Sequence, residues 1–243
     1  MQRTFNRVQL SEIFTSIEGE GILFGTKTMF IRMAGCPLNC RWCDTAYALP
    51  IDSGTTFSLS EAKELIMKNL QPNTYKVNFS GGEPLIQHEA VLELADFVQE
   101  KLKIKTYLES SCFDSVRFAK VLPYIDICKV EFKMKDSNVV GASDYENLLQ
   151  NEIDCLRIAV SHKKIVYIKI VITKSSSLVE FRYLIESIFE RIKALEIRGF
   201  IIQPSWGLDE PTTHQLFDFY DVIFPLYHDV RIIPQLHKVL GVR

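Results

Sequence analysis

Three closely spaced cysteines are the side chains of this sequence best suited to chemistry. Cys36, Cys40 and Cys43 have the spacing C-x3-C-x2-C and follow a strand-like apolar run at 29–33. Three thiolates this close in sequence can converge on one metal centre. Iron–sulfur clusters are held by cysteine thiolates, usually four, and no fourth cysteine follows nearby. A cluster held by three cysteines would keep one iron open to a substrate or cofactor.

A zinc site is the alternative interpretation of the same cysteines. Cys112, Cys128 or Cys155 could supply a fourth sulfur to a tetrahedral zinc ion. Zinc sites usually pair two C-x2-C units, however, and this chain has a single such unit, Cys40 to Cys43. The spacing therefore favours a cluster, and a zinc-stabilised binding module without catalysis is the alternative. We interpret Cys112, Cys128 and Cys155 as small buried hydrophobes.

Length, composition and charge narrow the class of protein. The 243 residues fit one large domain, and a hydrophobic content of 47% is ample for a core. The formal net charge of −2 gives no electrostatic argument for nucleic acid or an anionic membrane as the main partner. No apolar run reaches the roughly 18 residues that a membrane-spanning helix needs, and no secretory signal is visible. Six cysteines in this length do not make a disulfide scaffold, so we expect a soluble cytoplasmic protein.

Strand patterns alternate with helix patterns along the chain. Residues 9–20 predict a short strand and a turn, and further strands are predicted at 29–33, 75–79, 105–109, 125–132, 165–172, 199–203 and 230–233. Helices are predicted between them, with capping patterns at 58–61, 143–146 and 177–180. This alternation requires parallel strands joined by right-handed crossovers. We therefore expect an α/β fold in which residues 1–243 form a single domain, a partial or distorted parallel (β/α) barrel.

Polar residues gather where the predicted strands end. The cysteines follow the strand at 29–33, and Ser80 to Glu83, Glu109, Lys133 and Gln203 come at or after the ends of later strands. In parallel barrels the chemistry lies at the carboxyl ends of the strands. The topology and the polar residues thus predict the same location for the active site.

A second motif gives the cysteines a context. Gly81-Gly82-Glu83-Pro84 follows the second predicted strand of the barrel, as the cysteines follow the first. The two motifs together resemble the radical S-adenosylmethionine (SAM) superfamily, which binds SAM at the open iron of a [4Fe-4S] cluster. In that superfamily the Gly-Gly-Glu-Pro stretch contacts the amino end of SAM. The Gly-Gly-Glu-Pro stretch suits this contact. The ammonium group of SAM needs hydrogen-bond acceptors in a partly dry site, and glycine lets backbone carbonyls come close.

Within that superfamily the sequence resembles the 7-carboxy-7-deazaguanine synthase family over nearly the whole chain. The resemblance is concentrated at 12–21, 30–32, 42–45, 80–84 and 234–238. It implies that Cys36, Cys40 and Cys43 hold the cluster and that Thr45 binds Mg²⁺. It implies SAM-contact positions at Trp42, Cys43, Asp44, Gly81, Gly82, Glu83, Glu109, Glu131, Phe132, Lys133, Gln203, Pro204, Ser205 and Trp206. It implies substrate-contact positions at Ile17, Glu18, Gly19, Arg32, Ser80, His237 and Arg243.

The resemblance also implies a reaction. An electron from a flavodoxin- or ferredoxin-type donor would cleave SAM to methionine and a 5′-deoxyadenosyl radical. That radical would take a hydrogen from 6-carboxy-5,6,7,8-tetrahydropterin, whose ring contracts with loss of ammonia to give 7-carboxy-7-deazaguanine, a precursor of queuosine and archaeosine. We expect a homodimer. Arg32 suits the substrate carboxylate because its planar fork meets both oxygens, and Glu18 could accept from two N–H groups of the pterin's aminopyrimidinone edge.

The sequence departs from the family at some of these positions. Glu18 stands where the family commonly has Gln, and residues 131–133 and 109–111 also differ from its usual residues. The run 130–136 is similar to a pattern of glycyl-radical activating enzymes, which are the alternative among radical SAM enzymes. The departures concern substrate and SAM contacts and not the cluster.

The end of the chain carries a separate expectation. Residues 234–243 follow the last predicted strand without the length of a helix. In the resembled family this ending folds back to the active site. Leu236, Val239, Leu240 and Val242 are apolar, which is a poor composition for a solvated tail, and His237 is the side chain of the tail that can titrate near neutrality. We therefore expect the tail to pack against the site.

Overall fold

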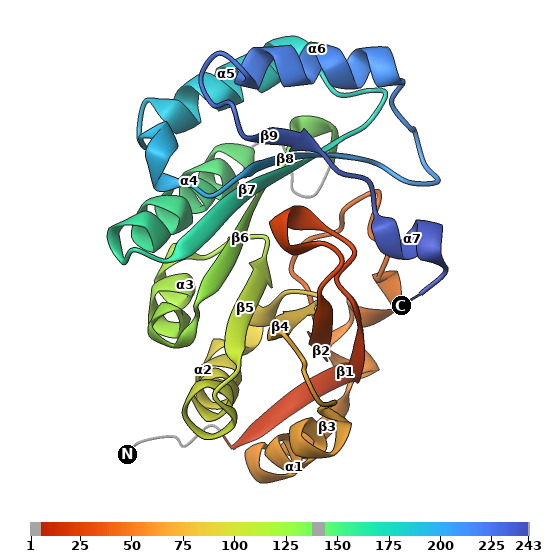
Figure 1. Cartoon of the computed structure of the whole chain (residues 1–243), viewed down its shortest axis with the longest axis vertical. Helices are drawn as coiled ribbons and strands as arrows, with labels where there is room; N and C mark the ends of the chain where they lie inside the picture. Colours follow the sequence, from red (N-terminus) through yellow and green to blue (C-terminus); the bar gives the residue numbers. More distant parts are fainter. Residues whose placement is uncertain (1–5, 138–143, 243) are drawn as a thin grey trace.

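A curved sheet organises the protein (Figure 1). The computed structural model describes residues 6–137 and 144–242. Their nine strands are paired in the order β3-β1-β2-β4-β5-β6-β7-β8-β9. The strands are β1 (Arg7–Ile17), β2 (Lys27–Met33), β3 (Thr55–Ser58), β4 (Lys76–Gly81), β5 (Lys105–Ser110), β6 (Ile127–Phe132), β7 (Ile165–Ile172), β8 (Phe200–Pro204) and β9 (Val230–Ile232). All neighbours from β2 to β9 are parallel, whereas β1 is antiparallel to both β2 and β3.

Helices cover the outer side of this sheet. The helices of the described residues are α1 (Leu59–Asn69), α2 (His88–Phe97), α3 (Ser115–Val121), α4 (Tyr145–Ser161), α5 (Leu178–Phe189), α6 (Thr213–Ile223) and α7 (Leu236–Leu240), of which α7 is not part of this cover. In Figure 1, α2 to α6 follow the outer side of the curve, and α7 lies apart from them near the C-terminus. The main hydrophobic core fills the space between these helices and the outward face of the strands.

The strands separate apolar from polar residues by their period of two. On β4, Val77 and Phe79 belong to the core under the helices, whereas Lys76, Asn78 and Ser80 alternate with them and face the inside of the curve. The same alternation holds along β5 to β8. The outward face therefore makes the core, and the inward face is available for a site.

The inward face is itself layered. Near the beginnings of the strands, an apolar cluster fills the interior with Tyr107, Ile127, Tyr167, Ile201 and Ile233. Two residues further along their strands lie Glu109, Lys129, Lys169 and Gln203. The interior is thus closed by apolar side chains at one end and polar toward the carboxyl ends of the strands, as in parallel barrels generally.

The expected architecture is confirmed. The sheet is α/β and mostly parallel, and it is a partial barrel because β3 and β9 are its two edges, with no pairing between them among the described residues. Two details differ from the expectation. The first strand is 11 residues long, and β3, which was not predicted, pairs with β1 at residues 55–58. A strand of four residues carries too little periodicity to be recognised, and pairing with β1 decides its conformation.

Helix starts follow their capping residues. Ser58 accepts from the N–H of Glu61, whose carboxylate accepts from the N–H of Ser58, which is the predicted capping box. Ser177 caps α5 as expected. The capping pattern at 143–146 begins at a residue outside those described. The expectation of a tail without a helix is wrong, because residues 236–240 form α7.

Backbone contacts tie the cysteine loop to the end of β4. The N–H of Gly82 donates to the carbonyl of Met33 (3.0 Å), and the N–H of Glu83 donates to the carbonyl of Gly35 (2.7 Å). A Cβ on Gly82 would overlap the backbone oxygen of Gly35. The cysteine loop and the segment after β4 can approach this closely only because residue 82 has no side chain.

Gly82→Ala is expected to destabilise the protein by about 3 kcal/mol, because a methyl group between two backbone segments cannot be relieved by side-chain movement. It should also lower the iron content after anaerobic reconstitution, since the cysteine loop must move. Urea unfolding and iron analysis measure both effects. The control is Gly25→Ala, where φ is +85° but no atom lies within 4 Å of the new Cβ, so that only backbone strain of about 1 kcal/mol is expected. Equal behaviour of the two variants would contradict the prediction.

Candidate active site

A cavity opens on the inward face of the sheet, at the carboxyl ends of the strands. Eighteen of the residues predicted to bind the cluster, SAM, Mg²⁺ or the substrate line it: Ile17, Glu18, Gly19, Arg32, Cys36, Cys40, Trp42, Cys43, Asp44, Thr45, Ser80, Gly81, Gly82, Glu109, Glu131, Lys133, Gln203 and His237. They come from β1, β2, the cysteine loop, β4 to β6, β8 and α7. The fold therefore brings into one cavity residues that the sequence separates widely.

The three clustered cysteines lie together at this cavity. Cys36, Cys40 and Cys43 are half-buried free thiols that line it. Burial raises the pKa of Cys36 to about 12 and also raises the pKa of Cys40. A metal centre would therefore displace protons when it binds these sulfurs. The remaining cysteines, Cys112, Cys128 and Cys155, are fully buried in the hydrophobic core and do not line the cavity, which argues against the zinc alternative.

Arg32 and Ser80 form a pair across two neighbouring strands. They are register partners on β2 and β4, and both line the cavity. The Arg32 guanidinium lies 3.8 Å from Glu12 and donates from Nη1 to the hydroxyl of Tyr47. Its Nε and the Ser80 hydroxyl oxygen are buried without a hydrogen-bond partner. Two buried polar atoms that face one cavity without partners are available to a ligand.

A buried ion pair forms the wall beside them. Lys76 donates to Glu18 Oε2 and, at 2.8 Å, to the hydroxyl of Thr28. Lys76 is fully buried and Glu18 is 2% exposed. Burial raises the pKa of Glu18 to about 7, although Lys76 opposes the shift, and the neighbouring Glu109 adds to it.

A carboxylate surrounded by three lysines lies at the centre of the polar layer. Glu131 forms ion pairs with Lys129 (2.9 Å), with Lys169 (3.1 Å) and with Lys133. Burial alone would raise the pKa of Glu131, but the three ammonium groups outweigh it and hold the pKa well below its usual range. Glu131 is therefore a buried anion whose charge is more than compensated. Lys169 carries the network onward to Glu20, at 2.6 Å.

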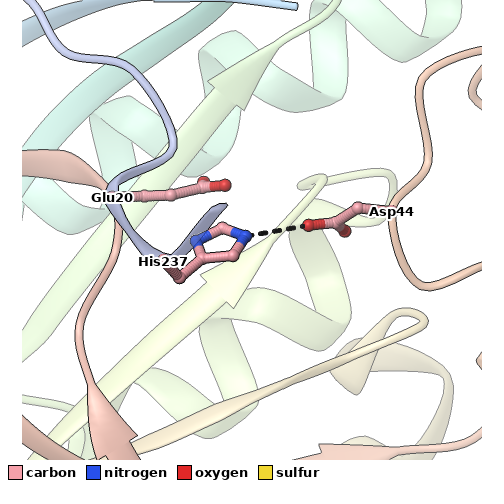
Figure 2. Close-up of side chains that lie close together, drawn as sticks. All are labelled: Glu20, Asp44 and His237. Carbon is pink, nitrogen blue, oxygen red and sulfur yellow. Dashed lines mark ion pairs between the residues drawn. The ribbon is translucent and has the colours of Figure 1, made fainter. Parts of the chain in front are cut away.

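A polar cluster closes the other side of the cavity. Figure 2 shows Glu20, Asp44 and His237, which come from the turn after β1, the cysteine loop and α7. His237 Nε2 lies 3.5 Å from Asp44 Oδ2, and the amide of Gln235 donates to Glu20 (2.7 Å) and Asp44 (3.2 Å). Partial burial raises the pKa of Asp44, but the His237 hydrogen bond and nearby Lys238 outweigh it, so this pKa is lowered.

The tail folds back onto the site, as expected, but not through its apolar residues. The N–H of Leu236 donates to the carbonyl of Gly19 (2.9 Å), and a Cβ on Gly19 would overlap the His237 ring. Val239 and Leu240 are instead 62% and 49% exposed. Backbone and polar contacts therefore hold the tail, and the argument from its apolar composition was wrong.

Several predicted contact residues do not line the cavity. Glu83 is buried with its carboxylate turned toward β5, where it accepts from Ser110, from the backbone and hydroxyl of Ser111, and from the N–H of Leu85. Phe132 packs in the core under the helices, because it alternates with Glu131 along β6. Pro204, Ser205 and Trp206 follow Gln203 but are not part of the lining, and Arg243 lies outside the described residues.

Sequence reasoning missed the lysines of the interior. Lys129, Lys169 and Gln235 line the cavity, and Lys76 supports its wall, yet none was singled out. A signal existed, since a lysine in an otherwise apolar strand such as Ile165–Ile172 marks an inward polar position. The other residues of β7 hide this signal, because an apolar, β-branched run of this length is typical of a strand buried on both faces.

Comparison with known proteins gives this site a family. Residues 17–145, just over half of the chain, match the family described as 4Fe-4S single cluster domain. The 7-carboxy-7-deazaguanine synthase of Methanothermobacter thermautotrophicus is 28% identical over 248 residues, 98% of each chain. That of Clostridium acetobutylicum is 31% identical over 158 residues, which are 63% of this chain and 68% of the relative. The chain belongs to the 7-carboxy-7-deazaguanine synthase family.

The fold agrees with this family. The crystal structure of QueE from Escherichia coli superposes with a TM-score of 0.66 over 95% of both chains, at 19% identity. At that identity the likeness concerns the fold. None of the helices described has the length and apolar composition that crossing a lipid bilayer requires.

The raised pKa of Glu18 predicts a pH dependence of stability. Between about pH 4.5 and 7 the folded chain holds a proton on Glu18 that the unfolded chain has lost, so its stability relative to Glu18→Gln should fall as the pH rises, by at most about 1.4 kcal/mol per pH unit. Urea unfolding of both proteins at pH 5, 6, 7 and 8 measures the slope. Glu18→Gln also leaves Lys76 without its counter-charge, which changes the stability of the variant in itself. The test is therefore how the stability difference changes with pH, and not how large that difference is at one pH.

The control is Glu64→Gln, an exposed glutamate of α1. Its stability difference from the unmodified chain should not change over the same pH range. A difference curve for Glu18→Gln as flat as that of Glu64→Gln would show that Glu18 has an ordinary pKa.

Proposed function

We propose that this protein converts 6-carboxy-5,6,7,8-tetrahydropterin to 7-carboxy-7-deazaguanine with loss of ammonia, a step toward 7-deazapurines. The support is membership in the 7-carboxy-7-deazaguanine synthase family. The structural observation that carries the proposal is one cavity lined by the three clustered cysteines and by Arg32 and Ser80, whose buried Nε and hydroxyl oxygen have no hydrogen-bond partner. Such a cavity can hold a redox centre and an anionic substrate side by side.

Cys36, Cys40 and Cys43 are proposed as the ligands of a [4Fe-4S] cluster. They fit it because they are free, adjacent in one loop and open to the cavity, whereas no other cysteine of the chain lines it. When bound, the cluster and SAM supply the electron transfer and the hydrogen-abstracting radical of this enzyme class. The protein itself must orient the reacting groups and exclude side reactions.

The substrate carboxylate is proposed to bind Arg32. Its Nε is buried without a partner, and a guanidinium can donate to both oxygens of a carboxylate. Ser80 can add a hydroxyl from the neighbouring strand. Ile17, Glu18 and Gly19 line the same cavity, and we propose that Glu18 accepts from N–H groups of the pterin's aminopyrimidinone edge.

SAM is proposed to lie between the cysteine loop and the polar layer. The residues of the predicted SAM set that line the cavity are Trp42, Cys43, Asp44, Gly81, Gly82, Glu109, Glu131, Lys133 and Gln203. Carboxylates and a buried, unpartnered Gln203 oxygen can accept from an ammonium group, and Lys133 can donate to a carboxylate. SAM carries both an ammonium group and a carboxylate at its methionine end. We assign Glu83 a supporting role, because its carboxylate is bound to the end of β5.

Mg²⁺ is proposed to bind at Thr45. Thr45 lines the cavity with its hydroxyl 3.7 Å from Cys43 Sγ, and Mg²⁺ prefers hard oxygen ligands, of which proteins usually supply only one or two. The site fits in its chemistry. The remaining ligands would come from substrate and water.

The wider setting of the enzyme follows the same family. We propose a flavodoxin- or ferredoxin-type electron donor that approaches the cysteine loop, where Asn39 and Arg41 are exposed. We propose that residues 1–243 act as one catalytic domain, that two copies form a homodimer, and that the compartment is the reducing cytoplasm. The last proposal is supported by six free cysteines.

Substitution of the cysteines tests the cluster. Cys36→Ala, Cys40→Ala and Cys43→Ala should each abolish iron binding and SAM cleavage, because a cluster with two protein ligands is not retained. Cys112→Ala, Cys128→Ala and Cys155→Ala are the matched controls and should bind iron as the unmodified chain does, at a stability cost of about 1 kcal/mol for a small buried group. Iron counting after anaerobic reconstitution is the measurement. A requirement for any of the three controls would disprove the three-cysteine site.

Turnover tests the function directly. The reconstituted protein, given SAM and an electron donor, should form 7-carboxy-7-deazaguanine from 6-carboxy-5,6,7,8-tetrahydropterin, and Mg²⁺ should stimulate this reaction.

The magnesium assignment is tested by a substitution. Thr45→Ala should lose the stimulation by Mg²⁺ and still cleave SAM. Mass spectrometry of the products of both proteins, with and without Mg²⁺, measures product formation and SAM cleavage separately. Absence of product from the unmodified chain would refute the proposed function, and equal Mg²⁺ stimulation in Thr45→Ala would refute the magnesium assignment alone.

A further inference from the structure

The inner face of β4 carries two residues for which the proposed reaction gives no role. Lys76 and Asn78 are fully buried and lie behind the cavity wall, on the face of the strand that also presents Ser80. We propose that Lys76 and Asn78 are positioning residues that hold the Glu18 carboxylate toward the cavity, and that this trio selects a substrate ring with two adjacent N–H donors. The inference rests on the proposed function and deepens it.

The contacts converge on one carboxylate oxygen. Lys76 donates to Glu18 Oε2, and the Asn78 amide approaches the same oxygen at 3.5 Å. Lys76 is held in turn by the Thr28 hydroxyl at 2.8 Å and by the ring of Tyr107, whose centroid is 4.5 Å from Nζ. Glu18 lines the cavity, whereas Lys76 and Asn78 do not. These two residues therefore hold the Glu18 carboxylate from the side that faces away from the cavity.

Stability alone is a poor reason for this arrangement. A buried ion pair is costly to desolvate, and apolar residues of similar volume often replace such a pair without loss of stability. Aromatic rings already surround Lys76, which lies near Phe30 as well as Tyr107. A methionine would therefore suit the packing, and the charge of Lys76 calls for another purpose.

That purpose is to favour the ionised form of Glu18 and to fix its orientation. The groups that face Glu18 are Lys76, two carboxylates, Glu109 and Glu20, and two buried phenols, Tyr107 and Tyr167. Lys76 is the cation among them. Burial and the carboxylates disfavour the charge on Glu18, and Lys76 opposes them. Without Lys76, Glu18 would lose both its counter-charge and its fixed orientation.

An oriented carboxylate recognises a particular chemical edge. Its two oxygens accept from two parallel N–H donors, as an amino group next to a ring N–H provides in an aminopyrimidinone. A polar site built for such donors rejects an analogue that lacks one of them far more strongly than an apolar pocket does, because its own groups are then left unpaired.

The test is substrate discrimination by Lys76→Met. The ratio of kcat/KM for 6-carboxy-5,6,7,8-tetrahydropterin to kcat/KM for its analogue without the 2-amino group should fall at least tenfold in the variant. KM for the natural ring should rise at least tenfold, with kcat within about twofold of the unmodified chain. A merely structural role would not change the ratio between two substrates.

The matched control is Lys105→Met. Lys105 is the register partner of Lys76 on β5 and is exposed, so its loss should leave KM and the ratio unchanged. If Lys76→Met does not fold, the double variant Glu18→Gln, Lys76→Met removes both buried charges and should fold. It is compared with Glu18→Gln alone, and because Lys76 acts through Glu18, the second substitution should add no further loss of discrimination. Unchanged KM and discrimination in Lys76→Met, or a further loss in the double variant, would overturn the inference while the proposed function stands. Absence of turnover by the unmodified chain would refute the proposed function and the inference together.

Discussion

Charge compensation inside the barrel is the condition on which this structure depends. The strands place ionised side chains where water is largely excluded, and a buried charge is tolerated only when an opposite charge and hydrogen bonds accompany it. Glu131 meets this condition with lysines from β6 and β7 and from the residue that follows β6. The network continues through Lys169 to Glu20. Because its members lie on different elements, the interior is stable only when the whole sheet is assembled.

This network also explains how the cavity can serve a polar reaction. Partner groups on neighbouring strands fix each ionised side chain, so the cavity presents charges in set orientations without reorganisation when a ligand enters. A few polar atoms are left without partners at the wall, among them Arg32 Nε, the Ser80 hydroxyl and Gln203 Oε1. In a lining that is otherwise satisfied, these atoms are the ones that a ligand can bind. The apolar layer of Tyr107, Tyr167 and their neighbours closes the opposite end against water.

The two motifs recognised in the sequence turn out to be one structural unit. The cysteine loop and the Gly-Gly-Glu-Pro segment are bound to each other through backbone hydrogen bonds, and Glu83 binds the segment in turn to the end of β5. The glycines are therefore required by a close approach of backbones as much as by a ligand. Glu83, which the sequence suggested as a ligand contact, stabilises this unit. The same few residues therefore serve both the proposed chemistry and the packing of these two segments.

The sequence by itself determined the alternation of strands and helices and the location of the cysteine loop at a strand end, because these follow from local periodicity and from short motifs. Most of the cavity lining followed from the resemblance of the sequence to a known family. Only the tertiary structure decided which charges meet. Glu18 and Lys76 are 58 residues apart, Glu20 and Lys169 149, and Glu20 and Gln235 215. Such pairs depend on strand register, on the curvature of the sheet and on the return of the tail. No local pattern encodes them, because each partner is specified by a different segment of the chain.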